Sequence, residues 1–434
     1  MILRALDVFL ASDRVGTLIQ LGLGNQARTR FVPETGLENG ASSSILTWAT
    51  KVPTSYRAAD SCDDHAGEIF HTQSGTLPAF VQNMLPEGPL REHLARIRGC
   101  ASDDHFDILA ACGNDLPGGL IVRPSEIDLQ RLSGLIAGVT SNLEPIQIAP
   151  ALRNASSLAG VQPKLALAES DGRYVASLNN PAGRHIIAKL PTMDAAGLTA
   201  VEALSMRLAH ASGVTTCRTA LEPMASIDEE VPFNLPDEPY FLAVERFDRG
   251  ANGKIHCEEF AQILAIPPQQ KYKHPAATYA HIAEVLMQMG REEDVAELVR
   301  RLAVNELLGN RDAHAKNFGV IYEQPGQPRL SPAYDIVAHA AYFSGAGHAL
   351  PFVHGGASAK RGMSPLVLQQ FCAAINYPET KAREVVRRTG EAALDVWPSL
   401  IADSRLHDGQ KRRLLLHLNS NAISASLIRR NRAR

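Results

Sequence analysis

The local patterns along the chain change character near residue 245, and this change restricts the folds that the second half of the chain can adopt. From about Ala151, the segments QPKLALAESDGRYVASL and RHIIAKL predict three strands. The first segment holds two of them, with an Asp-Gly turn between them. The segment GLTAVEALSMRLAHASG then has one apolar stripe and a stop at Gly213, which is typical of a helix. After the apolar strand EPYFLAVERFD, long helical patterns continue to the C-terminus. These patterns predict a small β-rich lobe joined by a short strand to a larger helical lobe.

The first hundred residues have a different pattern. Short alternating runs such as VGTLIQLGLG precede a helix pattern in GPLREHLARIRG. The turn-rich stretch GNDLPGGLIVRPSE, from Gly113 to Glu126, marks a boundary or a tight connection between strands. We therefore expect an α+β fold in three parts: an amino-terminal subdomain at 1–115, a β-rich lobe with one main helix at 116–244, and a helical lobe at 245–434.

Composition excludes several classes of protein. With 45% hydrophobic and 21% charged residues, the chain of 434 residues is typical of a globular protein rather than a disordered or fibrous one. A net charge of −3 gives no general attraction to nucleic acid or to anionic lipid, although the end of the chain, LIRRNRAR, is locally basic. Any contact with DNA is therefore expected to be local or to come through a partner.

The cysteines and the amino terminus indicate the compartment. Six cysteines stand far apart without a Cys-x-x-Cys pair, so a reducing environment is expected. The start, MILRALDVFLASDR, lacks the apolar core of a signal peptide, and no apolar run approaches the length that spans a bilayer. We expect a cytoplasmic protein.

The order of the two lobes resembles that of a protein kinase, but a fold alone does not establish a function. Phosphoryl transfer requires a Lys on the phosphates, oxygen ligands for Mg²⁺, and an Asp that orients the attacking hydroxyl. In the kinase catalytic loop this Asp precedes a metal-binding Asn by five positions. The segment GNRDAHAKNFGV places Asp312 and Asn317 at that spacing. We predict that Asp312 orients the acceptor hydroxyl, that Asn317 holds Mg²⁺, and that Asp335 in LSPAYDIVAH is a second metal ligand.

Upstream segments supply the remaining parts of a nucleotide site. The strand IIAK ends at Lys189, and Glu202 lies on the helix beyond it. An ion pair between them would hold the ammonium group toward the α- and β-phosphates. The strand FLAVERF would form the hinge, where backbone groups of Glu245 and Phe247 would hydrogen-bond adenine.

Each feature taken alone also has a structural explanation. An Asp and an Asn at this spacing occur by chance in many loops, Lys189 alone fits a solvated strand end, and Glu202 alone fits an exposed helix charge. Asp335 fits a helix cap or a turn. His314 fits a structural hydrogen bond as well as a nucleotide contact. A metal site in HCEE, at 256–259, is disfavoured because no further ligand follows at suitable spacing. The order of the motifs favours the kinase interpretation.

At these residues the chain resembles the HipA-like serine/threonine kinases, which are toxins of bacterial type II toxin–antitoxin pairs. The resemblance covers nearly the whole length and rests on SSLAGVQPKLAL, IIAKLP, LAVERFDR, EEFAQILAIPPQQKY, GNRDAHAKNFGV and PAYDI, in that order. In the amino-terminal part it rests on NMLPEGPLREHLA and GNDLPGGLIV. It implies a kinase-like bilobal fold with an extra amino-terminal α+β subdomain, and the cofactors ATP and Mg²⁺.

The resemblance also implies a phosphate loop and a switch. In place of a Gly-rich loop the family has Ala-Gly-x-Gln-x-Lys, which here is formed by Ala159, Gly160, Val161, Gln162 and Lys164. A serine just ahead of this loop is autophosphorylated in the family, and the matching position is Ser157, with Ser156 beside it. The added negative charge would repel ATP and switch the enzyme off. The alternative is that both serines are ordinary loop hydroxyls.

Two positions depart from the family pattern. Val201 replaces a common Asn before the helix Glu, and Pro163 replaces a commonly charged residue of the loop. The departure at Val201 is next to Glu202, so the pairing of Glu202 with Lys189 is the assignment that the resemblance supports least.

By the same resemblance, the substrate would be a component of translation such as an aminoacyl-tRNA synthetase, and its phosphorylation would arrest growth. A helix-turn-helix antitoxin would neutralise the chain and carry it to operator DNA. Two other functions stay open: a small-molecule phosphotransferase, and a non-catalytic pseudokinase that acts as a corepressor.

Overall fold

The structure is a computed structural model of the chain, and it describes residues 1–34, 46–52, 70–73, 75–126, 143–324, 326–345, 347–355 and 362–432. Cys62 and the last two residues of the basic end lie outside these ranges. None of the helices in the described ranges combines the length and the apolar character that crossing a membrane requires.

The amino-terminal part is built on a sheet in the order β4–β3–β2–β1–β5, with β6 parallel to β1. The strands are β1 (Ile2–Leu10), β2 (Asp13–Leu21), β3 (Arg28–Pro33), β4 (His71–Thr72), β5 (Leu120–Pro124) and β6 (Glu144–Pro145). Helices α2 (Ala79–Gln82), α3 (Gly88–Arg98) and α4 (His105–Cys112) accompany it, and their apolar side chains share one core with the sheet. The predicted helix in GPLREHLARIRG is α3, which ends at Gly99 with a left-handed φ of 73°.

The β-rich lobe forms a second sheet in the order β10–β11–β9–β7–β8. Its strands are β7 (Lys164–Ser170), β8 (Arg173–Ala176), β9 (His185–Lys189), β10 (Thr219–Pro223) and β11 (Tyr240–Glu245). The turn between β7 and β8 has positive φ at both Asp171 and Gly172, as the Asp-Gly hairpin signal predicts. Helix α6 (Leu198–Ala211) packs on this sheet through buried residues such as Val201 and Leu208.

The remaining chain is mainly helical. Its helices are α7 (Phe260–Ile263), α8 (Tyr279–Gln288), α9 (Glu292–Leu308), α10 (Pro365–Ala374), α11 (Glu379–Ala402), α12 (Asp408–Ser420) and α13 (Ala422–Arg432). Two short ladders accompany them: β12 (Arg249–Gly250) with β13 (Gly253–Lys254), and β14 (Cys257–Glu259) with β15 (Gly319–Gln324) and β16 (Gln327–Leu330). Helix α9 is almost entirely buried and ends at Gly309 with a left-handed φ of 62°, so the chain leaves it directly into the GNRDAHAKNFGV segment.

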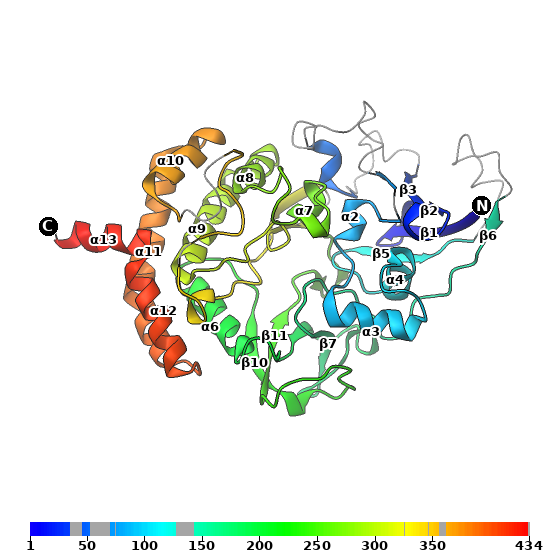
Figure 1. The fold of residues 1–434 in the computed structure, drawn as a ribbon, viewed down its shortest axis with the longest axis horizontal. Coiled ribbons are helices and arrows are strands. Elements are labelled where there is room, and N and C mark those ends of the chain that lie inside the picture. The colour runs from blue at the N-terminus through cyan, green and yellow to red at the C-terminus, as the bar shows by residue number, and fades with distance from the viewer. Residues whose placement is uncertain are drawn as a thin grey trace.

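These parts meet at the centre of the molecule. Figure 1 places the amino-terminal sheet and the carboxyl-terminal helices at opposite ends, with the β7–β11 sheet and α7 between them. The predicted α+β class is confirmed. The division at residues 115 and 244 stays a prediction, and the amino-terminal sheet continues to β5, beyond residue 115.

Candidate active site between the lobes

A cleft of about 360 Å³ receives side chains from the amino-terminal part and from both lobes. Its lining includes every residue that the sequence predicts for the nucleotide, the metal and the catalytic base: Ala159, Gly160, Val161, Gln162, Lys164, Lys189, Glu202, Glu245, Phe247, Asp312, His314, Asn317 and Asp335. The two candidate modification sites, Ser156 and Ser157, are outside this lining. Ala159 and Asp335, which are 176 residues apart in the sequence, therefore share one site.

Lys189 connects the two lobes within the cleft. Its Nζ lies 2.5 Å from Oε1 of Glu202 on α6 and also donates to Oδ1 of Asp335. Burial raises the pKa of Glu202 although Lys189 opposes the shift, and the two carboxylates keep the pKa of Lys189 above its ordinary value against the effect of burial. The ammonium group is therefore charged and fixed in place, as a phosphate-binding Lys requires.

The segment after α9 is held in shape by its own amides. The side chain of Asn310 donates to Oδ1 of Asn305 over 3.0 Å and accepts from the backbone N–H of Asp312 over 3.0 Å. The amide nitrogen of Asn317 donates to the carbonyl oxygen of Asp312 over 2.7 Å. Asp312 and Asn317 are thus locked into one compact loop. Asp335 follows with a φ of 59°, a left-handed conformation that only a fixed site maintains in a non-glycine residue.

The donor set suits Mg²⁺. Because the amide nitrogen of Asn317 is bonded within the loop, its oxygen is the atom left for a ligand, and the carboxylate of Asp335 is 40% exposed beside it in the same cleft. Mg²⁺ takes a few carboxylate and amide oxygens together with substrate phosphates. Among the described residues, no three His, Cys, Asp or Glu side chains gather as a self-contained metal site.

The backbone of the predicted phosphate loop bonds to the side chain of Lys164, the last residue of the loop. The Nζ of Lys164 donates to the carbonyl oxygens of Ala159 (2.7 Å) and Gly160 (2.8 Å), and Gln162 bonds to the carbonyl oxygen of Leu190. Gly160 has a φ of 97°, and a Cβ added there would lie 2.8 Å from the Lys164 Nζ. Burial, together with the charge of Lys189, lowers the pKa of Lys164 to about 8. The loop is tight enough to require glycine at residue 160.

The predicted hinge residues lie at the end of β11 and just beyond it, and both line the cleft. The backbone N–H of Glu245 donates to the carbonyl oxygen of Arg218, and that of Arg246 donates to His185. The N–H of Glu245 is therefore used within the sheet. Phe247 lines the cleft and packs on Tyr334, with ring centroids 5.8 Å apart.

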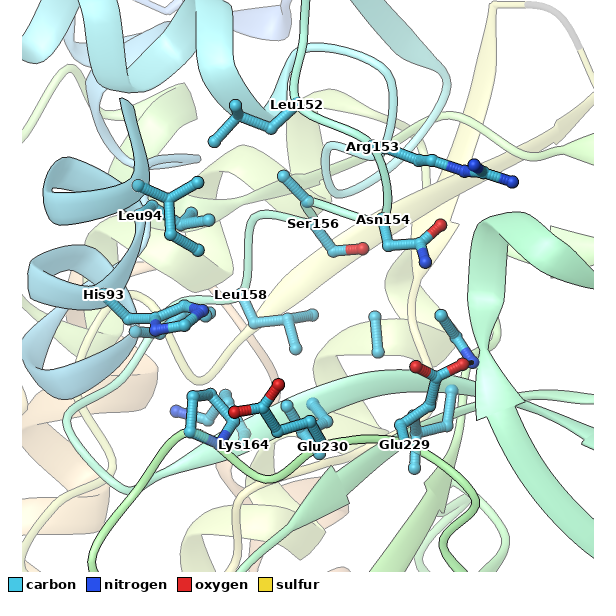
Figure 2. A pocket seen from close by; sticks show the side chains of 18 residues that line it. His93, Leu94, Leu152, Arg153, Asn154, Ser156, Leu158, Lys164, Glu229 and Glu230 are labelled. Atoms are coloured by element: carbon cyan, nitrogen blue, oxygen red, sulfur yellow. Dashed lines mark hydrogen bonds between the residues drawn. The ribbon is translucent and has the colours of Figure 1, made fainter. Parts of the chain in front are cut away.

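The two serines lie behind the phosphate loop. Ser157 is fully buried and donates to the carbonyl oxygen of Met84, while Ser156 Oγ lies 2.5 Å from Oδ2 of Asp115. Ser156 lines a separate cavity of about 310 Å³ between α3 and β7. Figure 2 shows this cavity with His93 and Leu94 on α3 at one side and Ser156 on the segment that leads to the loop. A phosphate could reach either serine only after the segment leaves this position.

His314 and Lys316 have separate environments in the catalytic loop. Burial lowers the pKa of His314 to about 4, and its Nε2 is 3.9 Å from Oδ1 of Asp312. Lys316 Nζ lies 2.6 Å from Oε1 of Glu87, which the amino-terminal part contributes to the cleft. Glu259 lies 3.9 Å from Lys316, and burial raises its pKa to about 7 although Lys316 opposes the shift.

Residues that the sequence analysis missed lie near Asp312, the predicted base. Glu87, Lys271 and Tyr272 line the cleft, and the hydroxyl of Tyr272 donates to Oδ1 of Asp312. Their only sequence signal is that they fall in NMLPEGPLREHLA and EEFAQILAIPPQQKY, two of the motifs that carry the family resemblance. The HCEE segment also has structural partners: His256 bonds to the carbonyl oxygen of Leu46, and Glu258 accepts from Tyr322.

The fold and the cleft define a two-lobed α+β protein with an added amino-terminal sheet and a candidate active site between the lobes. The sequence profile of the HipA-like C-terminal domain matches residues 156–397, and that of the HipA N-terminal domain matches residues 6–123. The chain therefore belongs to the HipA-like family, as the motifs predicted.

Individual relatives agree with this membership. "Putative kinase Y4dM" of Sinorhizobium fredii is 34% identical over 284 residues, which are 64% of this chain and 66% of that protein. "Putative kinase Y4mE" of the same organism is 31% identical over 284 residues, 61% of this chain and 64% of that protein. The chain thus matches just under two thirds of the length of these relatives.

A solved structure extends the likeness to the whole fold. A chain of the Shewanella oneidensis MR-1 toxin–antitoxin complex of HipA, HipB and operator DNA superposes with a TM-score of 0.62. The match has 18% sequence identity and covers 98% of this chain and 97% of that one. At this identity the likeness concerns the fold alone.

Proposed function

We propose that the chain is an ATP- and Mg²⁺-dependent serine/threonine protein kinase. The observation that carries the proposal is the convergence of Asp312, Asn317, Asp335 and the Lys189–Glu202 pair on one cleft. A lysine fixed by a buried carboxylate, two oxygen ligands and an Asp on a rigid loop are the parts that phosphoryl transfer needs. The names of the two Sinorhizobium relatives support the same activity.

Each residue has a distinct task in this proposal. Lys189 binds the α- and β-phosphates, and the loop at 159–164 covers them with its backbone. The oxygen of the acceptor hydroxyl bonds to the terminal phosphorus while the bond from that phosphorus to the bridging oxygen of ADP breaks. Asp312 accepts the proton of the hydroxyl. Asn317 and Asp335 would hold Mg²⁺, which supplies positive charge against the phosphates when it is bound. The buried cleft walls keep these groups oriented before the substrate arrives.

The serines ahead of the loop would act as a switch. Autophosphorylation of Ser156 would place about two negative charges against the carboxylate of Asp115, and that of Ser157 would place them in a buried position against the carbonyl oxygen of Met84. The phosphorylated segment would be expelled from its buried position, and the loop that follows it would lose its shape. Phosphorylation would therefore turn the kinase off.

The wider role follows the family. The chain would act as a growth-arresting toxin that phosphorylates a translation component such as an aminoacyl-tRNA synthetase. A helix-turn-helix antitoxin would neutralise it and bring it to operator DNA, a role supported by the likeness to a chain of the HipA, HipB and operator complex. The net charge of −3 favours DNA affinity that comes mainly from the antitoxin.

The test compares wild type with Asp312→Gln in a cell lysate supplied with labelled ATP, with labelled proteins identified by mass spectrometry. Wild type should label serine or threonine of specific proteins, and Asp312→Gln should label them at least about 10²-fold more slowly. Asp237→Asn, at an exposed position, is the matched control. Equal labelling by Asp312→Gln would disprove the role of the base. Label on small molecules alone would identify a phosphotransferase, and ATP binding without turnover would identify a pseudokinase.

A further inference from the structure

One tyrosine occupies the place where an acceptor hydroxyl would have to bind. Tyr272 lies on the segment between α7 and α8 and donates its phenolic hydrogen bond to Oδ1 of Asp312. Its ring is edge-on to His314, with ring centroids 5.0 Å apart, and the Lys271 ammonium lies 5.5 Å from the ring centroid. The contact joins residues 40 positions apart, so it results from the fold and not from local geometry.

The segment that carries Tyr272 is fixed, but the side chain is accessible. Backbone hydrogen bonds hold the segment: the N–H groups of Lys273 and His274 both donate to the carbonyl oxygen of Gln270 over 2.9 Å, and upstream Asn83 donates to the carbonyl oxygen of Ile266 over 2.8 Å. Tyr272 itself is 41% exposed at the mouth of the cleft. A rotation of this one side chain would uncover the carboxylate without moving the backbone.

A general base must lie within hydrogen-bond reach of the hydroxyl that it deprotonates. In this structure Oδ1 of Asp312 already accepts from the Tyr272 phenol. An acceptor hydroxyl that bonds to this oxygen would have to displace Tyr272. Water competes for this oxygen too, and transfer to water is the side reaction that a kinase has to suppress.

We propose that Tyr272 holds the acceptor position closed to water until a protein hydroxyl displaces it, and so sets the preference of the site for protein acceptors. The inference rests on the proposed kinase activity. In the productive reaction the terminal phosphorus separates from the bridging oxygen of ADP and bonds to the acceptor oxygen, whose proton passes to Asp312. With water in the same place, the products are ADP and inorganic phosphate.

The test measures two reactions of the full chain with ATP and Mg²⁺. The first is ATP hydrolysis without a protein acceptor, and the second is phosphorylation of dephosphorylated casein. Tyr272→Phe keeps the ring and removes the hydroxyl, so we expect hydrolysis to rise about tenfold, the size of effect expected for one hydrogen bond to a charged group. The KM for casein should fall several-fold, while the KM for ATP stays unchanged.

Two further variants separate this role from a structural one. Tyr272→Ser keeps a hydroxyl at this position, but the serine side chain is too short for that hydroxyl to reach Asp312. This variant should therefore raise ATP hydrolysis as Tyr272→Phe does. Tyr342→Phe removes a hydroxyl that donates to the carbonyl oxygen of Ala196 over 3.0 Å, away from Asp312, and should hydrolyse ATP at the wild-type rate.

The outcomes distinguish this inference from the function beneath it. Hydrolysis by Tyr272→Phe at or below the wild-type rate, with wild type labelling casein normally, would overturn the role of Tyr272 and leave the kinase intact. A wild-type chain that binds ATP but labels neither casein nor itself would overturn both.

Discussion

Two clusters of charged residues lie beside the cleft, and they are built differently. The first, which we call the hinge cluster, consists of Asp115, Arg246, Asp248 and Arg249. Its two arginines each contact both carboxylates, at nitrogen–oxygen distances of 2.7–3.3 Å, and no side chain in it is more than 9% exposed. Its charges are balanced, with two positive and two negative groups.

The second, the cleft cluster, consists of Lys189, Glu202 and Asp335. One ammonium group faces two carboxylates, so the formal charge is −1, and the carboxylate of Asp335 opens into the cleft. This cluster has an excess negative charge next to an accessible oxygen. A divalent cation and the phosphates of a nucleotide would complete it, whereas the hinge cluster is complete as it stands.

The pKa directions of the acids follow this difference only at Glu202, because Lys189 outweighs burial at Asp335 and lowers the pKa of that carboxyl to about 2. Burial alone would raise the pKa of Asp115, but Arg246 and Arg249 outweigh it and hold the pKa well below the ordinary value. In the cleft cluster, burial keeps the pKa of Glu202 raised even with Lys189 beside it. Removal of one partner from the balanced network would leave an uncompensated buried charge, whereas the unbalanced cluster has a carboxylate available for a ligand.

The strongest test of this contrast is Asp335→Asn. Because the variant removes the accessible carboxylate that would hold Mg²⁺, we expect phosphoryl transfer to fall by about 10³-fold or more. Stability should change by less than about 1 kcal/mol, since the side chain is partly exposed and Lys189 keeps Glu202. A kinase assay on casein and a thermal melt measure the two effects. Full activity would show that the cleft cluster is structural.

The converse test is Asp115→Asn. Its carboxylate contacts two buried arginines and accepts from Ser156 and from Ser177, so its loss leaves two buried arginines with one carboxylate, Asp248, between them. We expect the free energy of unfolding to fall by about 3 kcal/mol in urea. Asp237→Asn, at an exposed position, should leave it unchanged. A stability equal to wild type would remove the distinction between the clusters.

The sequence predicted the Lys189–Glu202 pair and placed Asp335 in the same site, but it predicted neither the contact of Lys189 with Asp335 nor the hinge cluster. Lys189, Glu202 and Asp335 each sit in a short motif with a strand, helix or loop context, and the order of those motifs was enough to place them together. Asp115 was read as part of a turn-rich boundary. Its partner Arg246 is 131 residues away, and no local pattern records a contact of that range.

The same limit applies within the cleft. The spacing of Asp312 and Asn317 within one loop indicated the pair, and the order of the other motifs favoured its interpretation as part of a kinase site. Glu87 and Lys316 are 229 residues apart, and the contact between Tyr272 and Asp312 crosses from one segment to another. The amino-terminal part completes the catalytic loop only through the tertiary fold, so these residues become visible only in the structure.

The smallest effect that we predict is a pH dependence of nucleotide binding through Lys164, which faces the cleft cluster. Burial and the charge of Lys189 lower its pKa to about 8, and Asp335, Glu87 and Glu202 partly oppose the shift. Bound phosphates favour the ammonium form and would raise this pKa again. Above pH 8 the free chain has lost a proton that binding must restore, so the dissociation constant for ATP should rise by up to about tenfold per pH unit.

Calorimetric titration of ATP with Mg²⁺ from about pH 7 to about pH 9 measures this slope. The slope should disappear in Lys164→Met, which has no proton to restore. Lys254→Met is the matched control: burial, with the charge of Arg249, lowers the pKa of Lys254 to about 8 as well, but this lysine donates to the carbonyl oxygen of Asn114 outside the cleft lining. Its loss should leave the slope as in wild type. A wild-type dissociation constant that does not change with pH would show that Lys164 does not contact the phosphates. The loop at 159–164 would then bind nucleotide through its backbone alone.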